Sequence, residues 1–216
     1  MRREIRWPRV WLSVALMLAV VAADAPAGGL GPAAAAAAEE TAVFAGGCFW
    51  GVQAVFQRVK GVTKAVSGYA GGSAGTAQYE LVSRGTTGHA ESVQVTYDPA
   101  RVSYAQLLQV FFTVAHDPTQ LNRQGPDVGT QYRSAIFYTS PAQKTGTQAF
   151  IDQLTASKTF PRAIVTQVVP LAGFYAAEAY HQDYLDRHPN DPYIVYNDWP
   201  KVRSLQKEFP ALYVEK

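Results

Sequence analysis

The chain has 216 residues and a mass of 23.5 kDa, with 48% apolar and 17% charged residues. This composition excludes a disordered acidic chain and a membrane bundle and leaves a globular protein. The formal net charge is +2, and the chain contains one cysteine, Cys48. A single cysteine excludes an intrachain disulfide, a zinc site of several thiolates and a CxxC redox pair, but it does not exclude catalysis by that thiol.

The first 27 residues have the pattern of a secretory signal. Four arginines precede the uncharged, largely apolar stretch 10–23, and small residues after it form A-x-A-like cleavage sites. This stretch is shorter than the roughly 20 residues that span a bilayer, so we expect a cleaved signal and an exported protein, in the periplasm, the cell envelope or the medium. An uncleaved signal that tethers the protein to a membrane is the alternative. Residues 28–40, rich in alanine, glycine and proline, are predicted to link the signal to a catalytic domain at 41–216.

The positive net charge belongs to the signal. Residues 1–38 contain the charged residues Arg2, Arg3, Arg6, Arg9, Glu4 and Asp24. The remaining chain has 15 basic and 15 acidic residues, so its net charge gives no electrostatic reason to expect nucleic-acid binding, which uses clustered lysines and arginines. We expect a monomer with no nucleic-acid partner.

Alternating periodicities predict interleaved strands and helices along the domain. Strands are predicted at 41–45, 64–69, 92–97, 135–139 and 164–170. Helices are predicted from Cys48 or its neighbour to Val59 with a stop at Gly61, after a capping box of Ser103 and Gln106, after Ser140-Pro141, and over 176–187. Residues 113–131 are a long polar stretch with little periodicity, which is typical of a functional or disordered loop.

In chain order these elements read β-α-β-β-α-β-α-β-α. Such interleaving predicts an α/β (α+β) domain built as a two-layer sandwich. Its most economical form is a ferredoxin-like split βαβ core with extra elements.

Cys48 is the first candidate for catalysis. A thiol in the first turn of a helix lies near unpaired backbone N–H groups and the positive end of the helix dipole, which lower its pKa. Glycines at 46, 47 and 51 let a substrate approach the backbone. A buried structural cysteine is the alternative, since free cysteines are often buried. The flanking glycines and the exposed position expected for Trp50 favour a nucleophile.

Five short motifs follow one another along the domain. They read GGCFWG at 46–51, GYAGG at 68–72, GHAE at 88–91, HDPTQ at 116–120 and GTQYRSAI at 129–136. In this order they resemble peptide methionine sulfoxide reductases of the A type, over residues 41 to about 199. The resemblance implies reduction of methionine sulfoxide, free or in oxidised proteins, to methionine. It also implies a role in protein repair and selectivity for the S epimer.

The resemblance also implies roles for the motif residues. Cys48 would attack the sulfoxide sulfur, and Glu91 would hydrogen-bond or protonate the sulfoxide oxygen as the S–O bond weakens. That role requires a carboxyl kept neutral near pH 7, which burial beside apolar groups such as Trp50 could achieve. Tyr79 and Tyr132 match the family's oxygen-binding pair, and phenols suit this role because they stay protonated.

Four further residues match family positions at the substrate site. Phe49 and Trp50 resemble the family's methyl pocket, since an aromatic wall suits the methyl group of a thioether. From the residues alone, Phe49 is typical of core packing. Asp127 matches a position near the oxygen site. His181 lies in a matching stretch, although a histidine on a helix face is more often a packing or solvated residue.

The histidines give no indication of a metal. None of the four lies at metal-ligand spacing from Cys48. His89 and His116 are expected to fix loops through hydrogen bonds. We therefore expect neither a metal nor a bound cofactor.

The sequence departs from the commoner family pattern in its cysteines. Many members have one or two further cysteines near the C-terminus, but residues 197–216 contain none, and Ser83 stands where a cysteine is often found. After attack, Cys48 must therefore become a sulfenic acid that cannot close an internal disulfide. An external thiol has to regenerate it: a thioredoxin-like protein in vivo, or dithiothreitol in vitro.

Two other classes of function remain open from the residues. A cysteine hydrolase or acyltransferase would pair Cys48 with His181 and an acidic partner. A non-enzymatic module that binds oxidised methionine would need no reactive thiol. The second class predicts that Cys48→Ser keeps binding, whereas the reductase predicts turnover that the substitution removes.

Overall fold

The computed structural model describes residues 38–216. The expected signal at 1–27 and most of the expected linker at 28–40 lie outside the described residues. The described residues belong to one compact unit. Between residues 38 and 216, the helices are too short or too polar to cross a membrane.

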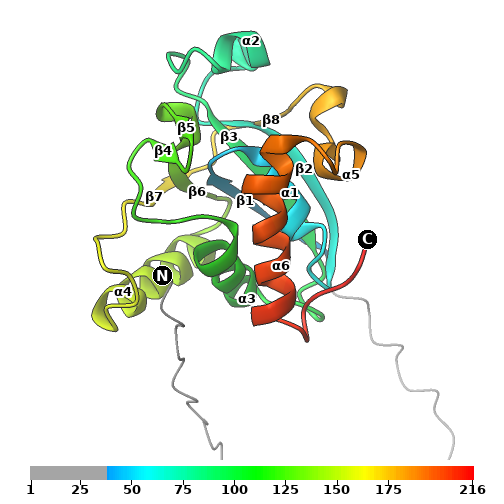
Figure 1. The fold of residues 1–216 in the computed structure, drawn as a ribbon. Coiled ribbons are helices and arrows are strands. Elements are labelled where there is room, and N and C mark those ends of the chain that lie inside the picture. Colours follow the sequence, from blue (N-terminus) through cyan, green and yellow to red (C-terminus); the bar gives the residue numbers. More distant parts are fainter. Residues whose placement is uncertain (1–37) are drawn as a thin grey trace, which may run out of the picture. The chain divides into compact units, whose positions relative to one another are not determined.

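A six-stranded sheet organises the domain (Figure 1). Its strands are β1 (Glu40–Gly46), β2 (Val62–Ala70), β3 (Ala90–Tyr97), β6 (Ser134–Tyr138), β7 (Gln167–Pro170) and β8 (Phe174–Ala176), in the order β7-β6-β1-β3-β2-β8. Within the four central strands β6-β1-β3-β2, each pair of adjacent strands is antiparallel. This is the arrangement of a split βαβ core, as the sequence predicts. β7 joins β6 in parallel, and β8 pairs antiparallel with β2.

The helices lie in front of this sheet, below it, and at the top and right side of the domain (Figure 1). They are α1 (Phe49–Phe56), α2 (Tyr79–Val82), α3 (Tyr104–Val110), α4 (Pro141–Ala156), α5 (Tyr184–Arg187) and α6 (Trp199–Glu208). Shorter turns are η1 (Ala74–Thr76), η2 (Phe111–Ala115), η3 (Thr130–Tyr132), η4 (Ala179–His181) and η5 (Ile194–Asp198). β4 (Arg123–Gln124) and β5 (Asp127–Val128) form a separate small hairpin. α1 packs on β1, β2 and β3, and α6 packs on α1.

The main core lies between the sheet and these helices. Phe44 of β1 stacks on Phe56 of α1 and also contacts Phe111, with ring centroids 4.9 Å apart in both pairs. Val93 and Val95 of β3 face the same core and are fully buried, as their alternation predicts. A smaller cluster of mostly small residues covers the other face: Val43, Ala45, Ala70, Ala90, Ala135 and Phe137. Burial on both faces keeps β1 rigid up to the turn before Cys48.

Three of the four predicted helix starts are confirmed. The Ser103 side chain accepts a hydrogen bond from the Gln106 N–H at 3.2 Å, and Gln106 Oε1 accepts from the Ser103 N–H at 2.9 Å, which completes the capping box. Ser140 caps α4, with Pro141 in its first turn. α1 begins at Phe49 with Cys48 as its N-cap, but it ends at Phe56 rather than Val59. Val59 instead forms a β-bridge with Tyr213.

The predicted helix over 176–187 is wrong. Residues 174–176 form strand β8, η4 is a single turn, and α5 begins only at Tyr184. The backbone between them is not helical, since Gln182 is extended and Asp183 has a left-handed φ of 54°. The N–H of Ala177 bonds to the Ser67 carbonyl at 2.9 Å instead of to its own segment. Tertiary hydrogen bonds therefore override the helical pattern of the apolar residues.

The predicted strand over 164–170 begins three residues late, at Gln167. The N–H of Val165 bonds instead to the Pro118 carbonyl at 2.9 Å, and the Thr166 hydroxyl bonds to Ser134 Oγ at 2.8 Å. These contacts hold residues 165 and 166 to a loop and to a side chain rather than to a strand.

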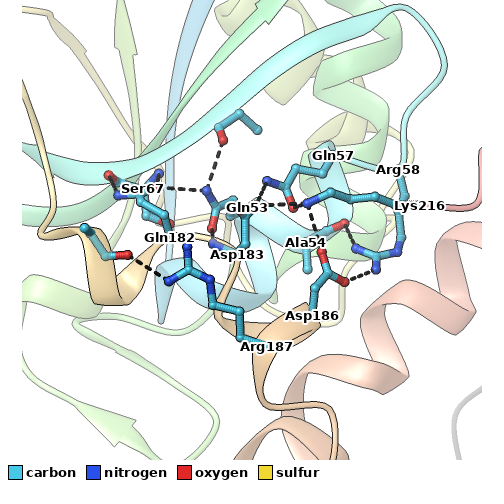
Figure 2. A network of polar contacts seen from close by, with 12 residues as sticks. Gln53, Ala54, Gln57, Arg58, Ser67, Gln182, Asp183, Asp186, Arg187 and Lys216 are labelled. Atoms are coloured by element: carbon cyan, nitrogen blue, oxygen red, sulfur yellow. Dashed lines mark hydrogen bonds and ion pairs between the residues drawn. The ribbon is translucent and has the colours of Figure 1, made fainter.

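A network of amide hydrogen bonds joins the segment after β8 to α1 (Figure 2). Gln182 Oε1 accepts from the Ser67 N–H at 3.0 Å and from Gln53 Nε2 at 2.9 Å, while Gln182 Nε2 donates to the Ser67 carbonyl at 2.9 Å. Gln53 Oε1 accepts from the Asp183 N–H at 3.0 Å. Because these groups are buried or partly buried, the bonds fix the position of residues 177–183.

Lys216 closes the same network (Figure 2). Its Nζ donates to Gln57 Oε1 at 2.9 Å, to Asp183 Oδ1 at 2.9 Å and to Asp186 Oδ2 at 2.8 Å. Asp186 also pairs with Arg58 of the turn after α1. Together these contacts hold residues 177–187, which include His181, against α1.

Candidate active site

Cys48 lies where β1 gives way to α1. It is the N-cap of α1, and its side chain is a free thiol with 8% exposure. The turn before it needs Gly47, whose φ is +92°. The space beside Gly47 is taken by the Gln124 side chain, since a Cβ there would lie 2.5 Å from Gln124 Cβ. The chain therefore places the thiol by a turn that only glycine fits.

Gly47→Ala is expected to destabilise the protein and to lower its activity together. The added methyl group meets both an unfavourable φ and the Gln124 side chain, and each costs about 1–3 kcal/mol. We expect a loss of about 2 kcal/mol or more in the free energy of unfolding, measured by urea denaturation. Gly75→Ala is the matched control, because a Cβ at Gly75 meets no atom within 4 Å; equal losses in the two variants would contradict this account.

The glycines around Cys48 do not serve the role expected from the sequence. They were expected to let a substrate approach the backbone, but protein side chains fill the space beside Gly47 and the space beside Gly51. Gln124 occupies the space beside Gly47, and the carboxylate of Asp198 that beside Gly51, where a Cβ would lie 2.1 Å from Asp198 Oδ1. The glycines instead allow other segments of the chain to pack against the turn that carries the thiol.

The expectation of a lowered Cys48 pKa is also corrected. Burial raises the pKa of the Cys48 thiol well above its ordinary value, and the charges of Glu91 and Asp198 raise it further. The backbone N–H of Trp50, in the first turn of α1, and the charge of Lys201 act in the opposite direction but do not outweigh burial. In the free protein the thiol is therefore protonated at neutral pH.

Glu91 comes from a strand, but its side chain lies beside Cys48 and bonds to the first residue of α1. It belongs to β3, opposite Tyr69 of β2, and its side chain is 3% exposed. Its Oε2 accepts a hydrogen bond from the Phe49 N–H at 3.0 Å. Burial raises the pKa of Glu91 to about 8, although this hydrogen bond opposes the rise. The role implied for Glu91, as the acid that protonates the sulfoxide oxygen, requires a carboxyl that is neutral near pH 7. The buried environment of Glu91 keeps its carboxyl neutral at that pH.

Tyr79 and Tyr132, from two other segments, lie close enough to Glu91 and Cys48 to interact with both electrostatically. Tyr79 begins α2, and Tyr132 ends η3. Burial raises the pKa of both phenols, and the charges of Glu91 and Cys48 raise both further. Both hydroxyls therefore stay protonated at neutral pH and remain available as hydrogen-bond donors. The structure thus brings Cys48, Glu91 and both tyrosines together.

Trp50 and His181 form one wall of the site. Trp50 is half-buried rather than exposed: its ring stacks on Tyr184 at 3.7 Å, and its Nε1 donates to His181 Nδ1 at 3.1 Å. Burial lowers the pKa of His181, so the ring accepts from Trp50 as a neutral imidazole. Phe49 is 1% exposed and belongs to the main core. Its ring centroid lies 5.0 Å from that of His181, which agrees with core packing.

Asp127 lies in β5 at the edge of the same site. Its Oδ2 accepts a hydrogen bond from the Tyr193 hydroxyl, and burial raises its pKa. Its charge in turn raises the pKa of Glu91 and of Tyr132. The short hairpin β4–β5 within the predicted loop 113–131 therefore carries a residue of the site, as expected for a functional loop.

Four residues of the site were not found from the sequence. Tyr193 holds Asp127, while Glu178 accepts from the Tyr79 N–H at 2.9 Å and from the Tyr69 hydroxyl at 2.8 Å. Asp198, which is fully buried, pairs with Lys201 Nζ at 3.0 Å. Asp198 and Lys201 lie three residues apart around Pro200, a pattern typical of a helix start. That pattern was the available signal for α6 and for this pair.

The geometry does not support a cysteine hydrolase. In the part of the chain that the structure describes, the hydrogen bond of His181 goes to Trp50, and its Nε2 lies 4.0 Å from Glu178 Oε2. The Nε2 atom of His181 is buried without a hydrogen-bond partner, and within residues 38–216 no hydrogen bond joins an imidazole to Cys48, as a thiolate–imidazole pair would require. His89 and His116 fix loops, as expected: His89 bonds Gly72 and Ser73, and His116 bonds Phe111 and Ser134.

The site combines groups with complementary chemistry. A buried sulfur nucleophile lies beside a carboxylic acid whose proton is retained near neutral pH, and two phenols can donate hydrogen bonds. Such a set can attack an electrophilic atom and deliver a proton to an oxygen bonded to it. Among residues 38–216, no group of three or more His, Cys, Asp or Glu side chains could hold a metal ion.

Comparisons with known proteins agree with this chemistry. The family model described as peptide methionine sulfoxide reductase matches residues 40–212. The chain is 63% identical to peptide methionine sulfoxide reductase MsrA 2 of Mesorhizobium japonicum, over 84% of this chain and 93% of the relative. It is 55% identical to the protein of the same name from Synechocystis, over 79% of each chain.

A solved structure gives the same result. The crystal structure of methionine sulfoxide reductase A of Corynebacterium diphtheriae has a TM-score of 0.63 and 36% identity, over 71% of this chain and 76% of the other. The family match covers the six-stranded sheet, α1 with Cys48 and every site residue named above. The chain therefore belongs to the peptide methionine sulfoxide reductase family, A type.

Proposed function

We propose that this protein reduces the S epimer of methionine sulfoxide, free or in oxidised proteins, through a cycle that uses Cys48 as its only thiol. The observation that carries the proposal is the pairing of a single cysteine at the start of α1 with a buried, neutral Glu91 that bonds the next backbone N–H. The nucleophile and the acid are thus fixed to the same turn of one helix.

In the first half of the cycle the oxygen leaves the substrate. The Cys48 sulfur attacks the sulfoxide sulfur, and Glu91 gives a proton to the oxygen as the S–O bond weakens. Tyr79 and Tyr132 donate hydrogen bonds to that oxygen while its charge develops. The S–O bond and the bond between the two sulfurs then break as the hydroxyl passes to the Cys48 sulfur, and the proton lost by the thiol restores Glu91. The substrate sulfur gains two electrons and becomes a thioether, while Cys48 loses two and becomes a sulfenic acid.

In the second half an external thiol restores Cys48. One thiol attacks the sulfenic acid, which forms a mixed disulfide and releases water. A second thiol then attacks that disulfide, which regenerates Cys48 and leaves the reductant oxidised. The sole cysteine of the chain excludes an internal disulfide, so each turnover requires reductant. A thioredoxin-like protein fits this role in the cell, and dithiothreitol replaces it in vitro.

The location of the protein follows from its first 27 residues. Their arginines and apolar stretch support export to the periplasm, the cell envelope or the medium, or tethering to a membrane by an uncleaved signal. The reductant must then also lie outside the cytoplasm.

The proposed activity is tested by the consumption of each epimer. Purified protein with excess dithiothreitol should convert S methionine sulfoxide to methionine and leave the R epimer unchanged. Chromatography of the two epimers over time measures both reactions. Equal consumption of both epimers would contradict the proposed selectivity, and no consumption of either would contradict the activity.

A further inference from the structure

The pair of Asp198 and Lys201 lies against the turn that carries Cys48. Asp198 ends η5 and Lys201 lies in the first turn of α6, the helix that packs on α1. A Cβ at Gly51 would lie 2.1 Å from Asp198 Oδ1 and 2.8 Å from Lys201 Nζ. Gly51 lies in the first turn of α1, directly after Cys48, so the pair packs against the turn that follows the thiol.

The burial of this pair is costly for a purely structural contact. Asp198 is fully buried, and the Lys201 side chain is 18% exposed. Only Oδ1 of Asp198 is bonded, to Lys201 at 3.0 Å, whereas Oδ2 is buried without a partner. A buried ion pair with an unsatisfied oxygen is usually no more stable than an apolar pair of the same size. The chain thus keeps a cation beside its thiol where a leucine or methionine would suffice for packing.

The charges around Cys48 are otherwise unfavourable to an anion. The charged and titratable groups that act on Cys48 or feel its charge are Glu91 of β3, Asp198 of η5, Lys201 of α6, Tyr79 of α2, Tyr132 of η3, Tyr184 of α5 and Tyr193 before η5. Lys201 is the cation in this set, and Asp127 and His116 also lie within reach of its charge. Burial alone would lower the pKa of Lys201, but Asp198 and Cys48 raise it above its ordinary value, so it stays charged.

We propose that Lys201, held in place by Asp198, is a positioning residue whose ammonium group stabilises the anionic form of the Cys48 sulfur when it attacks the sulfoxide. Lys201 makes no bond to the substrate in this scheme. It acts by lowering the free energy of the thiolate in a site where burial and the charge of Asp198 oppose it. The inference rests on the proposed function, since it concerns the same attack.

The rate at which iodoacetamide alkylates Cys48 tests this role directly. Cys48 is the sole cysteine, so intact mass reports its modification without ambiguity. Lys201→Met and Lys201→Gln remove the charge, and the glutamine amide can still donate to Asp198. Below the thiol pKa, a rise of one unit lowers the thiolate fraction tenfold, partly offset by a more nucleophilic thiolate, so we expect alkylation to slow by about threefold or more.

Two further variants separate charge from packing. Lys201→Arg keeps the charge and should stay within about twofold of wild type. Lys207→Met removes a positive charge from the exposed far end of the same helix and should have no effect beyond twofold. If Lys201 served only packing, its loss would loosen the site, and alkylation would become faster or remain unchanged. The rates are compared from pH 7 to a pH above the thiol pKa, because a pKa change shifts the profile along the pH axis, whereas altered access changes the rate reached on the plateau.

The outcomes are distinct from those of the proposed function. Slower alkylation in both neutral variants, with rescue by arginine and a matching fall in the single-turnover rate of methionine formation, supports the role. Alkylation within twofold of wild type in a folded neutral variant, or an arginine variant as slow as the neutral ones, overturns it. A wild type that reduces neither epimer would instead overturn the proposed function, whatever the alkylation rates.

Discussion

Replacing Cys48 by serine is expected to lower the rate of methionine sulfoxide reduction by roughly 10⁴-fold or more. The substitution keeps the size of the side chain but replaces a polarisable sulfur by an oxygen that stays protonated and cannot take up the sulfoxide oxygen. Since the chain has no other cysteine, no second thiol can replace it. Methionine formed with excess dithiothreitol measures the loss.

The matched control is Ser83→Ala. Ser83 follows α2 and its hydroxyl donates only to the Glu80 carbonyl, at 3.5 Å, so this variant should keep wild-type turnover. Turnover in the wild type and in Ser83→Ala, together with its loss in Cys48→Ser, distinguishes an enzyme from a binding module, which needs no reactive thiol. If Cys48→Ser turned over at the wild-type rate, the thiol would have no part in the reaction.

Glu91→Gln is expected to lower the rate and raise the stability of the protein. The amide can accept the Phe49 N–H bond as Glu91 does, but it cannot give a proton to the departing oxygen. General acid catalysis contributes about 10²–10⁴-fold, so a loss of that size is expected. Steady-state reduction of the S epimer measures it near pH 7, where the pKa of about 8 keeps wild-type Glu91 protonated.

The gain in stability has a definite pH dependence. The pKa of Glu91 is about 8 in the folded protein against an ordinary value of 4.5, so the folded state binds more protons between these values. Wild-type stability therefore falls as pH rises from about 4.5 to about 8, by roughly 3 kcal/mol at pH 7. Glu91→Gln lacks this loss.

Urea denaturation of both proteins at pH 5 and pH 8 measures this difference. The variant should exceed wild type by about 4 kcal/mol at pH 8 and by only about 1 kcal/mol at pH 5. An equal difference at both values of pH would show that Glu91 is ionised in the folded protein, which would contradict its role as the acid.

The sequence was sufficient where the signal is local. The capping box of Ser103 and Gln106, the cap and proline at Ser140-Pro141, and the alternation of Val93 and Val95 are decided by residues a few positions apart, and each is found in the structure. The split βαβ core follows from the order of these elements. Cys48 and Glu91 could be paired in advance only through their motifs.

The rest depends on contacts between distant segments. The helix expected over 176–187 fails because Gln182 and Asp183 bond to Gln53 and Ser67, more than 100 residues away. The lowered pKa expected for Cys48 fails because burial outweighs the start of the helix. Neither burial nor a long-range hydrogen bond leaves a periodic pattern in the sequence.

Helix α6 was missed for a different reason. Val202 and Leu205 are its buried residues, and a pair at one spacing of three is too short a pattern to predict a helix from periodicity alone. The cap signal of Asp198 and Pro200 was present, but its significance depends on Gly51, 147 residues earlier, against which the carboxylate packs.

The central claim is that the oxygen removed from methionine sulfoxide stays on Cys48 until an external thiol arrives. Its most direct test is the intact mass of the protein after one turnover with the S epimer and no reductant. One equivalent of methionine together with a single added oxygen on the protein is the predicted result. One equivalent of methionine with an unchanged protein mass would contradict the account, because the chain has no second cysteine to accept the oxidation.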